Sequence, residues 1–480
     1  MKKIVFVTLC LFASVYCRLQ IPKGFKFGVA TAAYQVEGGW NQDGKGENIW
    51  DRYTHTHKDQ IKDHSNGDIA CDSYHLWRKD VELLEELGVD FYRFSLSWSR
   101  ILPTGFSNKI NKAGVDYYNE TINLLISKNI EPMVTLYHWD LPQPLQDLGG
   151  WTNSLITDYF EDYARVAFTL FGDRVKLWIT INEPASICID TYENGNGAPG
   201  IKSPGLGSYL CGKNILLAHA KAYRLYQADF KNTQQGKVGI TIDSIWAEPK
   251  SKSQQDQDAS DREMQMSFGW YAHPIFSRKG HYPDVMIERI DALSVRQNFT
   301  RSRLPSFSAQ EIKLLRGSAD FLGLNHYHTW LVTSKNFTSN DISFLADKGT
   351  ILEKDPSWKD PEILPWGFTK LLSWIKDQYD NPLVYITENG IGDTTGTLND
   401  THRIEFIQEY VKAVLIAINT YECNVSRYTV WSLMDNMEWN QGYTIKFGIY
   451  QVDFHSPART RSEKKSAVFY KGLIMSTELD

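Results

Sequence analysis

The chain has 480 residues, 42% of them hydrophobic and 13% aromatic, so it can bury a large core and exceeds the length of a minimal domain. Its 51 basic and 57 acidic residues give a formal net charge of -6, which provides no basic excess for a nucleic acid or an anionic membrane. The composition therefore favours a neutral small-molecule substrate over a polyanionic partner.

The N-terminus has the pattern of a secretory signal peptide. Two lysines precede an apolar stretch from Ile4 to Val15, which is too short to span a bilayer. Cleavage is expected after Cys17, with Ala13 or Ser14 as other small residues that could serve. Since no later stretch reaches the apolar length of a transmembrane helix, we assign 1–17 to the signal peptide and 18–480 to one domain of a secreted, soluble protein.

Eight apolar runs rich in β-branched and aromatic residues follow along the chain and predict strands. They are Phe25–Tyr34, Phe91–Trp98, Met133–Trp139, Leu177–Asn182, Val238–Ile245, Phe321–Tyr327, Leu383–Glu388 and Tyr428–Leu433. Segments with helical periodicity lie between them: Tyr74–Leu87, Ala113–Lys128, Leu155–Phe171, Lys213–Phe230, Phe368–Tyr379 and Arg403–Tyr421. This alternation predicts an α/β fold, a single (β/α)8 TIM barrel.

The chain is longer than usual for this fold, so some of the loops that follow the strands must be enlarged. We expect the enlarged loops at Trp40–Asp68, Tyr192–Leu210, Glu248–Ala309 and Asn336–Pro365. They would wall a deep pocket over the strand ends.

The glycosylation motifs and the cysteines agree with export. Five Asn-x-Ser/Thr acceptors occur, at Asn119, Asn298, Asn336, Asn399 and Asn424. Outside the signal peptide only Cys71, Cys188, Cys211 and Cys423 remain, too few for a disulfide-built scaffold. Cys188 and Cys211 flank a loop rich in Gly and Pro, and the sequence is equally consistent with a disulfide between them and with two unpaired buried thiols.

Polar or aromatic residues end every predicted strand, at the face that carries the active site in barrel enzymes. In chain order they are Gln35; Arg93, Ser97 and Trp98; His138 and Trp139; Asn182 and Glu183; Asp243 and Trp246; Asn325 and Tyr327; Glu388 and Asn389; and Trp431. Glu183 and Glu388 stand out, because two carboxylates that meet in one cleft can divide acid, base and nucleophile roles. Cleavage of a glycosidic bond requires that division.

Six motifs carry a resemblance to a known family over about Phe25 to Tyr470. They are FGVATAAYQVEG at Phe27–Gly38, YRFSLSWSR at Tyr92–Arg100, LYHWDLP at Leu136–Pro142, TINEP at Thr180–Pro184, ITENG at Ile386–Gly390 and WSLMDNMEW at Trp431–Trp439. With them the chain resembles the retaining β-glucosidases of glycoside hydrolase family 1. The resemblance implies hydrolysis of small β-glucosides, with tolerance of β-galactosides or β-fucosides, and no cofactor.

The resemblance also implies roles for individual residues. Glu183 corresponds to the general acid/base and Glu388 to the nucleophile, about 5 to 5.5 Å apart as retention requires. Asn182 would hold the 2-hydroxyl of the sugar, and Tyr327 and Arg93 would hydrogen-bond Glu388. The remaining sugar contacts are assigned to Gln35, His138, Glu438 and Trp439 for the outer hydroxyls and to Trp431 beneath the ring, where the family has a cis peptide bond.

The chemistry supports these residue types independently. A nucleophilic carboxylate must be ionised, and a neighbouring guanidinium favours that form. The acid must begin protonated, which burial and an anionic neighbour favour. Once the nucleophile is consumed in the glycosyl-enzyme, the field on Glu183 disappears and the same group can activate water.

Structural explanations compete with some of these roles. The glutamates could be strand-end caps, Arg93 a buried ion-pair partner, and His138 a core histidine. The pairs His55/His57 and His326/His328 have a spacing seen in metal sites, but neither has a third ligand in sequence, so we predict no metal.

Two other functions fit the same motifs. A thioglucosidase of the myrosinase type would use the same pocket, although retention of Glu183 favours O-glucosides because sulfur leaving groups need no proton. The second function is that of a catalytically inactive sugar-binding module. Relatives of that kind lose one of the two glutamates, whereas both are present here. Departures from the family pattern at Asn325–His328, Met437 and Glu193–Gly197 lie on the side of the leaving group, whose identity is the least constrained inference.

Overall fold

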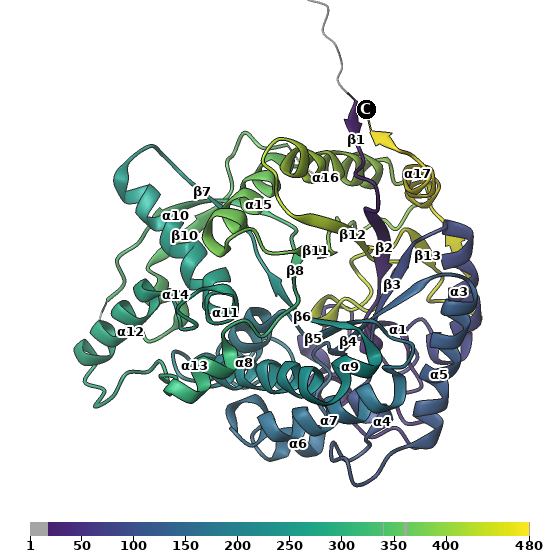
Figure 1. The fold of residues 1–480 in the computed structure, drawn as a ribbon, viewed down its shortest axis with the longest axis horizontal. Helices are drawn as coiled ribbons and strands as arrows, with labels where there is room; N and C mark the ends of the chain where they lie inside the picture. Colours follow the sequence, from purple (N-terminus) through teal and green to yellow (C-terminus); the bar gives the residue numbers. More distant parts are fainter. Residues whose placement is uncertain (1–17, 339, 360–361, 480) are drawn as a thin grey trace, which may run out of the picture.

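The structure, a computed structural model, describes residues 18–338, 340–359 and 362–479; the predicted signal peptide lies outside these residues. Eight parallel strands form a closed barrel at the centre of a ring of helices (Figure 1). The barrel strands are β2 (Lys26–Ala30), β3 (Phe91–Ser95), β4 (Glu131–Tyr137), β5 (Leu177–Asn182), β6 (Lys237–Asp243), β8 (Phe321–Asn325), β11 (Val384–Glu388) and β12 (Val425–Trp431). Each overlaps one predicted strand, and the predicted barrel is confirmed.

The barrel closes where β12 pairs with β2, and neighbouring strands otherwise follow chain order. Large side chains from the first residues of the strands fill the interior at its N-terminal end: Phe91, Met133, Leu177, Ile179, Phe321 and Tyr385. Because this end is filled by side chains, the polar residues at the opposite ends of the strands lie at the end of the barrel where enzymes of this fold bind their ligands.

In the described part of the chain, at least one helix follows each barrel strand. In chain order, eight of these helices are α3 (Ser73–Leu87), α5 (Lys112–Ser127), α7 (Ile156–Phe171), α8 (Gly207–Leu225), α13 (Ala309–Leu315), α15 (Pro365–Tyr379), α16 (Thr401–Asn419) and α17 (Lys465–Ile474). In α7 the buried residues Phe160, Ala164, Phe168 and Phe171 recur at helical spacing and form one face against the barrel. The helix α3 ends at Gly88, whose positive φ of 75° completes the cap.

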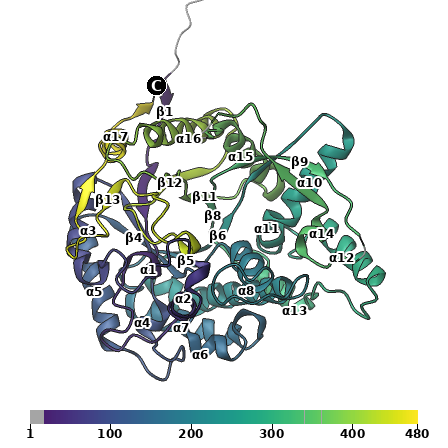
Figure 2. The same ribbon diagram turned by 180° about the vertical axis from the view of Figure 1, so that it is seen from behind.

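The predicted loop Trp40–Asp68 contains the helix α2 (Ile49–Thr56), and the predicted loops Glu248–Ala309 and Asn336–Pro365 contain several helices and strands. Strands β7 (Trp246–Pro249), β9 (Thr329–Ser334) and β10 (Thr350–Glu353) form a small sheet, joined by α10 (Gln254–Met266), α11 (Phe268–Phe276), α12 (Asp284–Arg296) and α14 (Phe344–Lys348). These elements extend to one side of the barrel (Figure 2). The sequence did not reveal them because the strands are short and partly exposed, and α10 is mostly polar.

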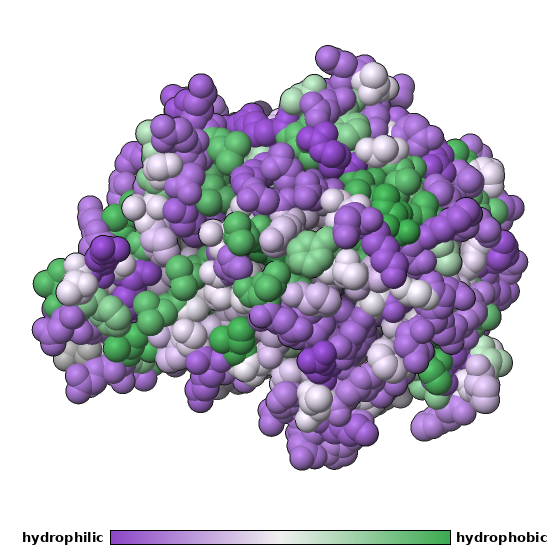
Figure 3. Space-filling model, turned by 90° about the horizontal axis from the view of Figure 1, so that it is seen from below, coloured by the Kyte–Doolittle hydropathy of each residue, from purple (hydrophilic) through white to green (hydrophobic). Residues whose placement is uncertain are grey.

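The first and last described residues lie side by side. Strand β1 (Leu19–Gln20) pairs antiparallel with β15 (Glu478–Leu479), next to α16 (Figure 1). Among the described residues, none of the helices combines the length and the apolar character needed to cross a bilayer. On the face shown in Figure 3 hydrophilic side chains predominate and hydrophobic ones form separate patches.

The structure pairs Cys188 with Cys211, while Cys71 and Cys423 are buried free thiols. This resolves the alternative that the sequence left open. Of the predicted glycan acceptors, Asn298, Asn336, Asn399 and Asn424 are exposed. Asn119 differs from them, because it is half-buried within α5 and its amide oxygen accepts a hydrogen bond from Arg174 at 2.8 Å.

Candidate active site

Two strand ends deliver the two glutamates to the same face of the barrel. Glu388 is the last residue of β11, opposite Asn325 of β8. Glu183 follows β5 directly and has a positive φ of 53°, a conformation that a residue with a side chain rarely adopts. Its backbone N–H donates to the carbonyl of Thr241 at 3.0 Å, which fixes this conformation. Such a left-handed residue at a strand exit is typical of a functional site.

Glu388 is held by two donors. Arg93 Nη1 donates to Oε1 at 2.5 Å, and the Tyr327 hydroxyl donates to Oε2 at 2.6 Å. Both glutamate and arginine are buried, with 4% and 1% of their surface exposed. A buried carboxylate that receives a guanidinium and a phenol, one on each oxygen, is complemented as an anion.

Glu183 has a different set of neighbours. Asn325 Nδ2 donates to Oε1 at 2.6 Å and Ser186 Oγ donates to Oε2 at 3.2 Å, so both donors are neutral. Burial, followed by the negative charges of Asp243 and Glu388, raises the pKa of Glu183 well above its usual range. The protonated acid is therefore favoured here.

Asn182 connects the two glutamates. Its Oδ1 accepts hydrogen bonds from Arg93 Nη2 at 2.6 Å and from Asn325 Nδ2 at 3.1 Å. Arg93 and Asn325 are the residues that bind Glu388 and Glu183 respectively. The structure thus brings both predicted catalytic residues and Asn182 into one hydrogen-bonded network.

The residues predicted to contact a sugar surround this network. Gln35 Nε2 donates to the carbonyl of Met437 at 2.9 Å and lies 3.4 Å from Glu438 Oε2. Burial, and then the charge of Glu388, raises the pKa of Glu438 to about 8. His138 Nε2 lies 3.2 Å from Asn182 Nδ2, and burial, with the charge of Arg93, lowers its pKa well below the usual range, so the imidazole is neutral.

Aromatic rings form the wall of the site. The ring of His138 is nearly parallel to those of Trp431 and Trp439, and its centroid lies 5.8 and 6.0 Å from theirs. Trp139 lies 4.6 Å from Trp439, and its indole N–H donates to the carbonyl of Asn182 at 3.0 Å. The peptide bond between Trp431 and Ser432 is cis, as the resemblance implied. Flat rings of this kind suit the apolar face of a sugar.

Three further residues belong to the site although they have no role in the interpretation of the motifs. Asn325 binds Glu183, Asp243 acts on its pKa, and Ser186 contacts it directly. From the sequence, Asn325 and Asp243 are identified only as polar residues at strand ends. Their position at strand ends is the only indication in the sequence that they belong to the site. Their contact with Glu183 depends on how β5, β6 and β8 pair in the barrel.

The two histidine pairs have other partners. His55 Nε2 bonds Asp68 at 2.7 Å, and His326 Nδ1 bonds the carbonyl of Ser244 at 2.8 Å. Burial lowers the pKa of His326 to about 3, as expected for a neutral core histidine. Within the described part of the chain, His, Cys, Asp and Glu form no cluster of three that could hold a metal.

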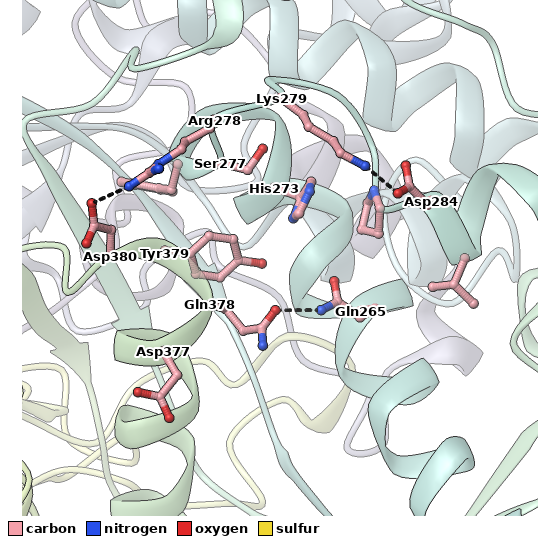
Figure 4. Close-up of a pocket in the computed structure, with 13 residues that line it drawn as sticks. Gln265, His273, Ser277, Arg278, Lys279, Asp284, Asp377, Gln378, Tyr379 and Asp380 are labelled. Carbon is pink, nitrogen blue, oxygen red and sulfur yellow. Dashed lines mark hydrogen bonds and ion pairs between the residues drawn. The ribbon is translucent and has the colours of Figure 1, made fainter.

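A second groove lies away from this site. It runs between the end of α11, the start of α12 and the end of α15 (Figure 4). Four of its charged residues form two ion pairs, Arg278 with Asp380 and Lys279 with Asp284. No residue of the glutamate network lines it.

Comparison with known proteins agrees with the geometry. Residues 17–479 match the model of the family described as Glycosyl hydrolase family 1. Myrosinase 1 of Brevicoryne brassicae is 48% identical over 95% of this chain and 98% of its own length. The cytosolic beta-glucosidase of Homo sapiens is 42% identical over 96% of this chain and 99% of its own length.

Solved structures give the same result. Aphid myrosinase is 47% identical and superposes with a TM-score of 0.92 over 95% of this chain and 99% of that chain. A mutant rice beta-glucosidase in a covalent complex with Glc is 38% identical, with a TM-score of 0.90 over 95% and 98%.

Proposed function

The chain belongs to glycosyl hydrolase family 1 and is a glycoside hydrolase, and from this premise we propose that it is a retaining β-glucosidase acting on small β-glucosides. The observation that carries the proposal is the unequal environment of the two glutamates. Glu388 is bound by a cation and a phenol, whereas Glu183 is bound by neutral donors and has a raised pKa. One group is prepared to attack and the other to give a proton.

The reaction then has two steps. In the first, a Glu388 oxygen bonds to the anomeric carbon, the bond to the leaving oxygen breaks, and the Glu183 proton passes to that oxygen. In the second, Glu183 takes a proton from water, the water oxygen bonds to the anomeric carbon, and Glu388 is released as the carboxylate. The rice relative's covalent complex with Glc supports such an intermediate.

The other site residues bind the sugar. Gln35 and Glu438 would hold its outer hydroxyls together with His138 and Trp439, while Trp431 lies beneath the ring. Asn182 would hold the 2-hydroxyl, in a hydrogen bond that strengthens as positive charge develops on the sugar.

The experiment compares wild type with Glu388→Gln on an aryl β-glucoside. We expect the variant to lose at least about 10⁴-fold in kcat, as for removal of a covalent nucleophile. Proton NMR of the first glucose released should show the β anomer. Unchanged turnover by the variant would refute Glu388 as the nucleophile, and initial release of the α anomer would refute retention.

A thioglucosidase is the second candidate, because the aphid relative at 48% identity is a myrosinase. The presence of the acid Glu183 favours O-glucosides. Turnover of cellobiose, an aryl glucoside and a glucosinolate by the same preparation decides between them, since a preference for the glucosinolate would reverse the assignment.

We also propose that the enzyme is secreted and N-glycosylated. The sequence pattern of residues 1–17, four exposed acceptor motifs and the Cys188–Cys211 disulfide support this. Disulfides persist mainly in oxidising compartments.

A further inference from the structure

A cavity of about 460 Å³ opens beside Glu183. Its wall includes Ser186, whose hydroxyl donates to the Glu183 carboxyl at 3.2 Å. Since Glu183 is the group that would protonate the leaving oxygen, a leaving group that extends from Glu183 past Ser186 would enter this cavity. Apolar residues contribute much of the lining: Ile189, Ile245, Phe344, Leu345 and Leu352.

Three of the five charged residues of this cavity are neutralised or engaged by neighbours. Glu263 forms an ion pair with Lys348 and also accepts a hydrogen bond from Thr350. Glu193 accepts hydrogen bonds from the Ser208 hydroxyl and from the backbone N–H of Phe344.

The two remaining charged residues are Asp190 and Asp243. Asp190 lies in the short π-helical segment Ser186–Thr191 and is exposed at the rim, and Asp243 ends β6 and is half-buried. Neither forms an ion pair with another described residue. Burial, with the charge of Asp190 and of Glu388, raises the pKa of Asp243 to about 7. The cavity therefore carries excess negative charge above neutral pH.

We propose that Asp190 and Asp243 select the charge of the leaving group. The cavity would accept a partly apolar leaving group that presents a hydroxyl or an amine, and it would disfavour one that carries a negative charge, such as a sulfated leaving group. The inference rests on the proposed β-glucosidase function. It identifies the class of substrate from the two carboxylates, which accept hydrogen bonds and repel anions.

Three β-glucosides of equal shape test this selection. Their phenyl leaving groups carry a para aminomethyl, hydroxymethyl or carboxylate group, and kcat/KM is measured for each at pH 7.5. We expect the cationic substrate to exceed the anionic one about tenfold in wild type, as for partly screened charges at close range. The ratio should approach one in Asp190→Asn. The control Asp380→Asn, in the separate groove of Figure 4, should retain the wild-type ratio.

The outcomes separate the two claims. Turnover of all three substrates at equal rates, or a tenfold ratio that survives in Asp190→Asn, would overturn the charge selection and leave the glucosidase intact. Turnover of none would contradict the glucosidase. In that case, calorimetry with free 4-(aminomethyl)phenol and 4-hydroxybenzoate still tests the cavity, since tighter binding of the amine supports the proposal and equal binding refutes it.

Discussion

At the scale of single residues, the proposed chemistry depends on neighbours that make two identical carboxyl groups unequal. The guanidinium of Arg93 and the phenol of Tyr327 bind Glu388, and only neutral groups donate to Glu183. Asn182 lies between these two sets and joins them. A change in any of these neighbours should therefore affect one half of the reaction more than the other.

The first prediction concerns Tyr327. Tyr327→Phe removes the 2.6 Å hydrogen bond to Glu388 Oε2 but retains the ring. A hydrogen bond to a charged group contributes about 1.5–3 kcal/mol, so kcat/KM should fall about 10- to 100-fold. Tyr421→Phe is the matched control, because Tyr421 is 48% exposed. Equal activity of both variants would remove Tyr327 from the catalytic network.

The second prediction concerns pH. The alkaline limb of kcat/KM should report loss of the Glu183 proton, because the protonated acid is the active form. The charge of Asp243 helps to raise this pKa, so Asp243→Asn should lower it and move the limb to lower pH. Asp380→Asn should leave the limb in place. If the alkaline limb of Asp243→Asn stays at the same pH or moves to higher pH, Asp243 does not raise the pKa of Glu183.

At the scale of elements, the close packing at the N-terminal end of the barrel requires glycine at two strand positions, because a side chain there would collide with an aromatic ring. A Cβ at Gly28 in β2 would lie 2.5 Å from the ring of Phe91, and one at Gly239 in β6 would lie 2.6 Å from the ring of Phe321. Both glycines thus make room for the aromatic residues that close the interior.

The third prediction follows from this contact. Gly28→Ala should destabilise the protein by about 1–3 kcal/mol through overpacking, measured as a lower Tm. Adding Phe91→Leu should recover part of the loss. Gly472→Ala in α17 is the control, because its Cβ would meet no atom within 4 Å and its Tm should not fall. Equal melting of the two alanine variants would show that the floor of the barrel is loosely packed.

Patterning predicted the barrel strands and most covering helices, because strands buried on both faces form continuous apolar runs. It overextended the first strand, predicted to Tyr34, whereas β2 ends at Ala30 and Tyr34 lies in the short helix α1 (Ala33–Val36). Patterning did not predict the sheet of β7, β9 and β10. In this sheet β7 pairs with β9, a strand that lies far from it in sequence.

At the scale of the whole molecule, those site residues could be predicted that belong to a recognisable sequence motif. Residues such as Glu183 and Glu388 stand in recognisable strings, and the structure brings them together. Asn325 ends β8 and Asp243 ends β6, and both act on Glu183, which follows β5 and lies far from them in sequence. Their partners follow from the register of the closed barrel, which a single sequence does not show.

The fourth prediction concerns the exported protein. Expressed in a secreting eukaryotic host, the mature chain should begin at Arg18 and carry glycans at the four exposed acceptors. Occupancy should be lowest at Asn119, whose amide is bound by Arg174 within α5. Mass spectrometry after enzymatic deglycosylation in heavy-oxygen water measures each site. Retention of residues 1–17 in the secreted protein would contradict the proposed signal peptide.

The most direct test of the account is to trap the covalent intermediate. A 2-deoxy-2-fluoro β-glucoside with a good leaving group should label the enzyme once, and peptide mapping should place the sugar on Glu388. The Glu388→Gln variant should remain unlabelled. A label on Glu183 or on any other residue would contradict the assigned nucleophile and with it the proposed division of roles.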